Sequence, residues 1–87
     1  MNDTILLNPA DQVVVALRDL HRGISVIVSG SNVILVEDIE FGHKIAIRPI
    51  LAGEHVLKYG LPIGSATRDI LPGEHVHTHN LQSDYAV

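Results

Sequence analysis

The chain has 87 residues, an apolar content of 46% and a formal net charge of −4 at pH 7. A chain of this length forms one domain and buries only ~60–65% of the surface that its unfolded form exposes, so a large substrate cleft with its own walls is not expected. The absence of cysteine excludes disulfides, thiolate metal sites and cysteine nucleophiles. The basic residues are scattered and aromatic residues are scarce, which argues against a nucleic-acid partner.

Two further features concern location. No apolar run approaches the ~18 residues of a membrane span, so no membrane association is expected. The first residues lack a basic segment followed by an apolar run, so no secretory signal is expected either. The cytoplasm is the expected location.

In chain order, the predicted elements are short strands joined by tight turns. Residues 13–17 form an apolar run; a helix over residues 10–20 is the alternative, but three consecutive valines favour a strand. Residues 25–29 alternate in polarity, and a turn cluster at 29–32 leads into residues 33–36, which predicts a hairpin. Residues 44–50 also alternate, with Ile45 and Ile47 on one face. From Gln82 onward a frayed tail is expected, which gives a domain of residues 1–81 and a tail of 82–87.

A heptapeptide is repeated along the chain. ILAGEHV at residues 50–56 returns as ILPGEHV at residues 70–76, and a weaker copy, LHRGISV, occupies residues 20–26. Pro72 and Gly73 fit the two central positions of a type II turn, in which glycine supplies a positive φ. Each copy is therefore expected to read strand, tight turn, strand. Gly53 and Gly73 are predicted to have positive φ, and at most one short helix is expected in the molecule.

Histidine is suited to metal binding and to proton transfer near neutral pH. The chain has six histidines, and five of them lie from His43 onward. In a strand, His75, His77 and His79 would share one face and could converge on a metal ion or act in proton transfer. A solvated strand with water-bound imidazoles is the alternative. His75 recurs as His55 in the middle copy of the repeat, which indicates a role in the shared turn. His77 and His79 occur only in the last copy and are the better functional candidates.

Other polar residues near these histidines fit supporting roles. His43 opens a strand and is expected to serve as a third ligand, a base or a plain turn residue. The cationic side chains that could clamp a substrate carboxylate are Lys44, Arg48, Lys58 and Arg68, although a solvated strand face explains most of them. Glu54 and Glu74 follow turn glycines at equivalent places and are expected to be structural.

Three segments together carry a resemblance to a known family. They are GHKIAI at residues 42–47, KYGLPIG at 58–64 and GEHVHTHN at 73–80, and VALRDL at 15–20 fits the same pattern. In this order they resemble the N-terminal region of the altronate dehydratases. The resemblance implies a mostly β SAF domain with a β-clip fold, which is either fused to a large catalytic domain or made as a separate small subunit. Since the chain stops shortly after the HTHN run, a separate small subunit is expected.

The function that the resemblance implies is elimination of water from an aldonic or aldaric acid. On that basis His43, His77 and His79 are assigned as catalytic residues, with His77 and His79 as metal ligands. Lys44, Lys58 and Asn80 are assigned to substrate binding. The expected cofactor is a divalent metal, iron (Fe²⁺) or manganese, shared with a large catalytic subunit, without which the chain is expected to be inactive. Two alternatives stay open: the small subunit of a sulfolactate sulfo-lyase, and a non-catalytic sugar-binding or assembly module. Self-association into a homo-oligomer is also left open.

Overall fold

The computed structural model describes residues 3–84, and all the regular elements in that range are β-strands. Nine short strands are joined by tight turns. They are β1 (Thr4–Ile5), β2 (Val13–Ala16), β3 (Ser25–Val28), β4 (Ser31–Ile34), β5 (Lys44–Ala46), β6 (His55–Lys58), β7 (Leu61–Ala66), β8 (His75–Val76) and β9 (Leu81–Gln82). The expected mostly β architecture is confirmed, and residues 13–16 form a strand rather than a helix. Within residues 3–84 no helix is long and apolar enough to cross a membrane.

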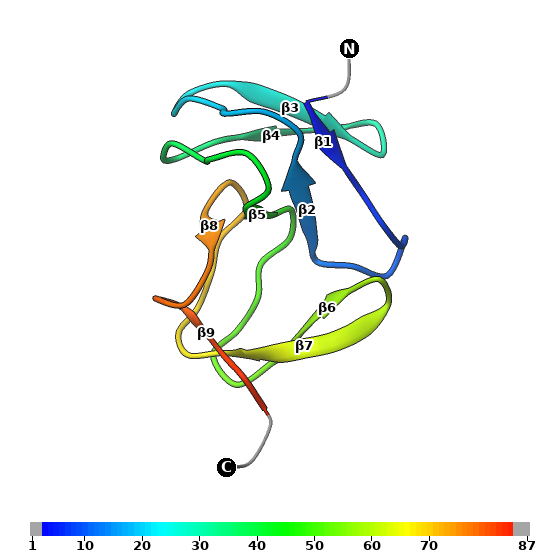
Figure 1. Ribbon diagram of the computed structural model, residues 1–87, viewed down its shortest axis with the longest axis vertical. Coiled ribbons are helices and arrows are strands. Elements are labelled where there is room, and N and C mark those ends of the chain that lie inside the picture. The colour runs from blue at the N-terminus through cyan, green and yellow to red at the C-terminus, as the bar shows by residue number, and fades with distance from the viewer. Residues whose placement is uncertain (1–2, 85–87) are drawn as a thin grey trace.

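The strands form three small antiparallel sheets (Figure 1). The central sheet has the order β1-β2-β5-β8, the β3–β4 hairpin lies at one end of the molecule, and β6-β7-β9 lies at the other. Both hairpins turn over two residues with positive φ: Ser29 and Gly30 in one, Tyr59 and Gly60 in the other. Paired positive φ values match the right-handed twist of the strands that such turns join.

The middle of the central sheet is buried on both faces. Val14 and Ile45, paired across β2 and β5, pack in the core beneath the β3–β4 hairpin. Val13 and Ala46, the next pair in the register, pack in a second core beneath β6 and β7. The alternation expected for residues 44–50 places Ala46 on a polar face, but Ala46 is fully buried because a second core covers that face. The strand itself ends at Ala46.

In residues 3–84 the repeated turn occurs four times, one more than the sequence predicted. In the turns that begin at His21, Glu40, Leu51 and Leu71, the N–H of the fourth residue donates to the carbonyl of the first, at 2.9–3.1 Å. The third residue of each turn is a glycine with a φ between 83° and 91°, which confirms the prediction for Gly53 and Gly73. The additional copy, IEFGHKI at residues 39–45, shares only its aliphatic ends and its glycine with the others.

The four turns associate in two pairs. Leu20 pairs with Ile39 and Ile50 pairs with Ile70, each through two backbone hydrogen bonds. Copies one and two therefore form one half of the molecule, and copies three and four form the other. Glu54 and Glu74 accept hydrogen bonds from the N–H groups of Leu51 and Leu71, so the structural role expected for both glutamates is confirmed.

The chain remains paired beyond the expected start of its tail. Gln82 lies in β9 opposite Ser65, and Asp84 accepts a hydrogen bond from the Ser65 hydroxyl. The ordered domain therefore reaches at least Asp84, while the rest of the expected tail, residues 85–87, lies outside the described residues.

Candidate functional site

Four histidine rings gather where β5 begins and β8 ends. Lys44 pairs with Val76 in the β5–β8 register, which brings His43 opposite His77 at the open end of that ladder. The His43 ring stacks on His75 and on His77, with centroids 4.9 and 4.8 Å apart. The His79 ring lies 5.3 Å from that of His75. The structure thus brings together the three predicted catalytic histidines and adds His75, which the repeat had assigned to the turn.

His43 and His75 form the closest contact in this histidine cluster. Nδ1 of His43 lies 2.8 Å from Nε2 of His75, so one of these nitrogens carries the proton and the other accepts it. Nε2 of His43 faces the Glu40 carboxylate at 3.8 Å. The carboxylate of Glu37 accepts the backbone N–H of His75 at 3.0 Å. The cluster therefore has carboxylates beside it that can stabilise a protonated imidazole.

The position of His75 changes its acid–base behaviour. Burial lowers the pKa of the His75 imidazole, and repulsion from His43 and His79 lowers it further; the negative charge of Glu37 acts in the opposite direction. A lowered pKa keeps this ring neutral around pH 7, which is the form that binds metal ions or accepts a proton.

Asn80 holds in place the histidine segment, residues 75–80. Its side chain is fully buried. Its Oδ1 accepts the N–H of His77 at 2.9 Å, and its Nδ2 donates to the carbonyl of His75 at 2.8 Å. Asn80 was assigned to substrate binding on the resemblance, but its side chain faces the protein's own backbone. We therefore assign it a positioning role.

The predicted substrate-binding lysines lie away from the histidines. Side chains alternate along β5, so Lys44 points to the face shared with Ala46, whereas His43 points to the face shared with Ile45. Lys58 ends β6, in the opposite half of the molecule from β3 and β4. Lys44 thus lies on the face of β5 opposite to that of His43, and Lys58 lies in a different sheet from the histidines.

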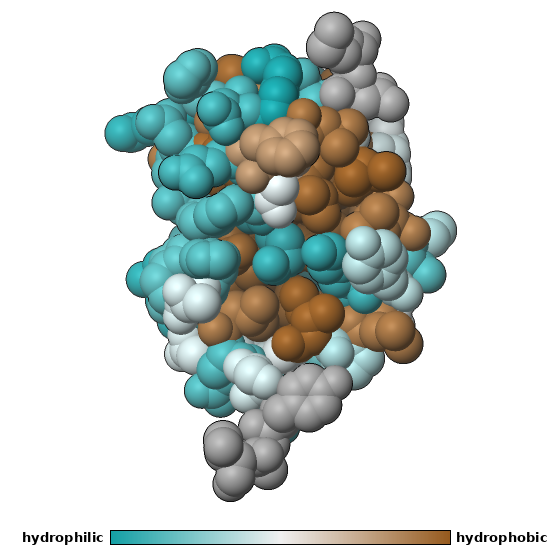
Figure 2. All heavy atoms as spheres, viewed as in Figure 1, coloured by the Kyte–Doolittle hydropathy of each residue, from teal (hydrophilic) through white to brown (hydrophobic). Residues whose placement is uncertain are grey.

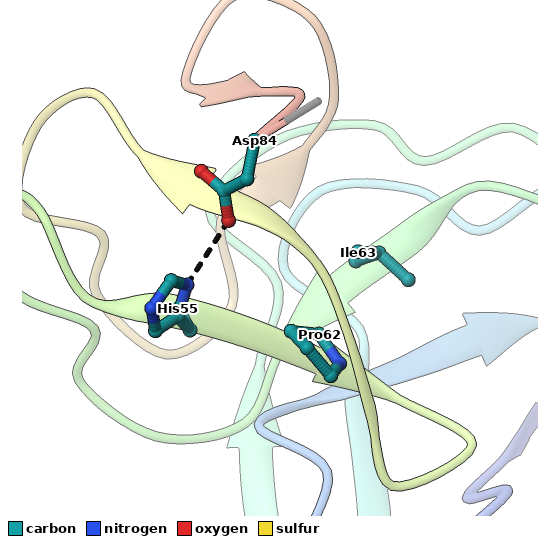
Figure 3. A pocket seen from close by; sticks show the side chains of 4 residues that line it. All are labelled: His55, Pro62, Ile63 and Asp84. Atoms are coloured by element: carbon teal, nitrogen blue, oxygen red, sulfur yellow. Dashed lines mark hydrogen bonds and ion pairs between the residues drawn. The ribbon is translucent and has the colours of Figure 1, made fainter. Parts of the chain in front are cut away.

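A separate polar group surrounds His55 (Figure 3). Nδ1 of His55 lies 3.0 Å from Oδ2 of Asp84, and the Ser65 hydroxyl donates to Oδ1 of the same carboxylate at 2.6 Å. The Ser65 hydrogen bond is the main cause of a lowered pKa at Asp84, and His55 adds to it. A cavity of about 250 Å³ adjoins this group, lined by His55, Pro62, Ile63 and Asp84.

The His55 group has the composition of a serine-hydrolase triad but not its geometry. The Ser65 proton goes to the carboxylate, and the Ser65 oxygen is 3.5 Å from the same His55 nitrogen that meets Asp84. A nucleophilic serine requires the other imidazole nitrogen as its base. The group therefore serves to anchor the chain at Asp84.

Comparison with known proteins places the chain in a family. Residues 2–84 match the model of the altronate/galactarate dehydratase SAF domain. The chain belongs to this family. It is 39% identical over 84 residues to the altronate dehydratase of Bacillus subtilis (strain 168), and 46% identical over 80 residues to that of Escherichia coli (strain K12). These matches cover 97% and 92% of this chain but only 17% and 16% of those enzymes.

A second kind of relative is shorter. The chain is 47% identical over 45 residues to the (2R)-sulfolactate sulfo-lyase subunit alpha of Chromohalobacter salexigens, and 46% identical over 46 residues to that of Paracoccus pantotrophus. The matched segments cover 48% and 69% of those subunits and about half of this chain. The resemblance to the altronate dehydratase family is confirmed, and these subunits are relatives of the domain as well.

Proposed function

We propose that this chain is the SAF part of a sugar-acid dehydratase of the altronate dehydratase type and that its histidine cluster takes part in the elimination of water. The observation that supports this proposal is the grouping of four imidazoles at one edge of a family member whose long relatives are named altronate dehydratases. Because the chain spans about one sixth of those enzymes, the remaining catalytic groups belong to a large partner subunit or domain.

The elimination requires three functions that imidazoles can share. A base removes the proton next to the carboxylate, an acid protonates the leaving hydroxyl, and positive charge stabilises the enediolate between the two steps. His77 and His79 are exposed and can reach a substrate held by a partner. The His43–His75 contact holds one proton between two rings, so this pair can deliver or take up a proton without large movement.

The donor set also fits a divalent metal ion. Among the described residues, His43, His75 and His77 each offer one ring nitrogen, and these nitrogens lie within 4.8 Å of one another. These three residues would hold the metal, rather than the His77 and His79 pair expected from the sequence. A bound Fe²⁺ or Mn²⁺ would supply positive charge for the substrate carboxylate and α-hydroxyl.

A sulfo-lyase is the second candidate. Its support is the match to two short sulfo-lyase alpha subunits, which shows that relatives of this domain occur in subunits of comparable size. That reaction would use the same removal of an α-proton, with sulfite as the leaving group. The altronate dehydratase function ranks first because the matches to altronate dehydratases cover nearly the whole chain.

A chimeric enzyme tests the proposal. The segment of the E. coli altronate dehydratase that matches this chain is replaced by this chain, and dehydration of altronate is followed with Fe²⁺ or Mn²⁺. We expect turnover well above that of the truncated enzyme lacking the segment. A folded chimera that restores no turnover on altronate, while a sulfo-lyase large subunit mixed with this chain cleaves sulfolactate, would favour the second candidate. Restoration of neither reaction would leave a binding or assembly module.

A further inference from the structure

A further cavity, of about 190 Å³, lies at the turn of the β3–β4 hairpin. Figure 2 shows, in the orientation of Figure 1, that hydrophobic areas of the molecular surface border on a hydrophilic belt. The lining of this cavity is mixed in the same way, and none of its residues belongs to the histidine cluster or to the group around His55. Three aliphatic and three polar residues line it: Val28, Val33, Ile47, Ser29, Ser31 and Arg48.

The aliphatic residues of this cavity belong to the core. Val28 and Val33 are buried in the core beneath the hairpin, and Ile47 packs against the same core. Aliphatic side chains held in this way form a fixed apolar wall. Such a wall favours the alkyl part of a ligand, because contact removes apolar surface from water.

The polar side of the cavity carries a positive charge. Nη2 of Arg48 donates to the carbonyl of Pro9 at 2.9 Å, which holds the guanidinium in place. A guanidinium has five N–H donors, so further donors of Arg48 are free to meet a second acceptor. No ion pair joins Arg48 to a carboxylate within residues 3–84. A fixed guanidinium without a counter-charge favours a carboxylate ligand, which it can bind through two parallel hydrogen bonds.

The repeat indicates what Arg48 lacks. Arg48 stands two residues before the third copy of the repeated turn, and Arg18 stands two residues before the first. Nε of Arg18 donates to the carboxylate of Asp3 at 2.9 Å, so in the first copy the chain itself provides a carboxylate for this arginine. Beside Arg48 the described part of the chain has a cavity instead. A carboxylate from another molecule would take the equivalent place.

The hairpin turn adds two hydroxyl groups. Ser29 has a φ of 50°, which is uncommon for serine, and the usual residues in such a turn are Asn, Asp and Gly. Ser31 begins β4 on the other side of Gly30. Neither serine hydroxyl forms a hydrogen bond to the protein within residues 3–84. Both hydroxyls are therefore available to a ligand in the cavity that they line.

We propose that this cavity is a binding site for the carboxylate of a small aliphatic acid. The guanidinium of Arg48 donates two hydrogen bonds to the carboxylate, and a serine hydroxyl donates a third. The alkyl chain of the acid lies against the aliphatic wall. The site shares no residue with the histidine cluster, so it does not depend on the proposed dehydratase function.

Backbone NMR of the metal-free 87-residue chain tests the site with three probes, titrated at constant pH and ionic strength. Sodium butyrate has a carboxylate and an alkyl chain, n-butanol has the chain alone, and sodium phosphate has the charge alone. We expect saturable shifts with butyrate at the amides of Ser29, Ser31 and Arg48, with a Kd on the order of 1–10 mM. The other two probes should bind at least ~10-fold more weakly. Binding of butanol or of phosphate as tight as that of butyrate, or shifts with butyrate that do not saturate, would overturn the proposal.

Variants decide whether the named residues are responsible. Arg48→Met removes the charge but keeps a long side chain and should weaken butyrate binding at least ~10-fold, whereas Arg48→Lys should weaken it less. Arg68→Met removes an exposed cation that stands at the same place in the fourth copy and should leave binding unchanged. Ser29→Gly removes one hydroxyl with a residue that suits the positive φ, so it should fold and weaken binding ~3-fold or more. Unchanged binding in Arg48→Met, or in Ser29→Gly if Arg48→Met fails to fold, would contradict the proposed site.

Discussion

At the scale of single residues, burial and hydrogen bonding distinguish the histidines that we propose to act in catalysis from the residues that support them. His77 and His79 are exposed and occur only in the last copy of the repeat, as the sequence comparison indicated. His75 is different, because the same position in the repeat has a different environment in each copy. As His55 it meets Asp84 and Ser65, whereas as His75 it meets His43. The spacing of residues within one strand does not reveal which other strand pairs with it. The contact between His43 and His75 was therefore not predicted from the sequence.

The lowered pKa of His75 predicts how stability depends on pH. The unfolded chain takes up a proton at His75 near pH 6.5, but the folded chain does so only at lower pH, so the free energy of unfolding falls as the pH drops below about 6.5. Urea unfolding of the metal-free chain between pH 7.5 and 5.5 should show this slope. His75→Gln should flatten it, while His21→Gln, on a separate turn, should not. Equal slopes in the wild type and His75→Gln would contradict the assignment.

Asn80 should be the residue on which the histidine segment depends most. Asn80→Ala leaves the His77 N–H and the His75 carbonyl without their buried partner, so we expect a loss of about 2–4 kcal/mol in unfolding free energy. Asn32→Ala, at an exposed position of β4, should cost less than ~0.5 kcal/mol. Denaturant titration measures both. A loss at Asn80 as small as that at Asn32 would show that its hydrogen bonds do not position the segment.

At the scale of elements, the repeated turns could be predicted from the sequence, but which turn pairs with which could not. Two nearly identical heptapeptides and a glycine at a fixed place were enough to predict the turns and their positive φ. The second copy, at residues 39–45, was missed because only Ile39, Gly42 and Ile45 match the repeated pattern. The acidic step Glu37-Asp38 before it was the available signal, since Asp19 and Asp69 precede other copies. Burial of both faces of β5 was also missed, because the second core comes from residues distant in the sequence.

Hydrogen bonds between paired turns explain the positions of two prolines, Pro49 and Pro72. The N–H groups of Arg22, Phe41 and Ala52 each donate at 2.8 Å to an aspartate of the paired turn. The fourth turn has Pro72 at that place, which has no N–H to donate, and its partner copy has Pro49 where the others have aspartate. Between the third and fourth turns, this one hydrogen bond therefore lacks both its donor and its acceptor.

This symmetry predicts an interaction energy between positions 49 and 72. Pro72→Ala restores the N–H and Pro49→Asp restores the carboxylate, so the double variant should be more stable than the sum of the single changes by about 1 kcal/mol, the contribution of one hydrogen bond. A double-mutant cycle by urea unfolding gives this value, and the effect of each proline on the unfolded chain cancels within the cycle. A coupling near zero would mean that the four turns are not equivalent in this respect.

At the scale of the whole molecule, the fold supports the proposal that the chain acts together with a large partner subunit or domain. Its two small cores lie on opposite faces of one sheet, and the histidines lie at the open end of a strand pair, where the rings of His77 and His79 are exposed. Such an edge cannot exclude water by itself. The purified chain with Fe²⁺ or Mn²⁺ should therefore dehydrate altronate or galactarate far more slowly than an ordinary enzyme rate of ~1 s⁻¹. Turnover at that rate without a partner would show that the domain contains a complete active site.

We propose that the histidine cluster acts in the reaction and not in the fold, and a comparison of His77→Ala with His21→Ala in the chimeric dehydratase tests this. Both histidines are exposed, so neither change should alter the free energy of unfolding of the isolated chain by more than ~0.5 kcal/mol. We expect kcat on altronate to fall by ~10²-fold or more for His77→Ala and to stay unchanged for His21→Ala. A large loss of stability in His77→Ala, with unchanged activity per folded molecule, would contradict it and make the cluster structural.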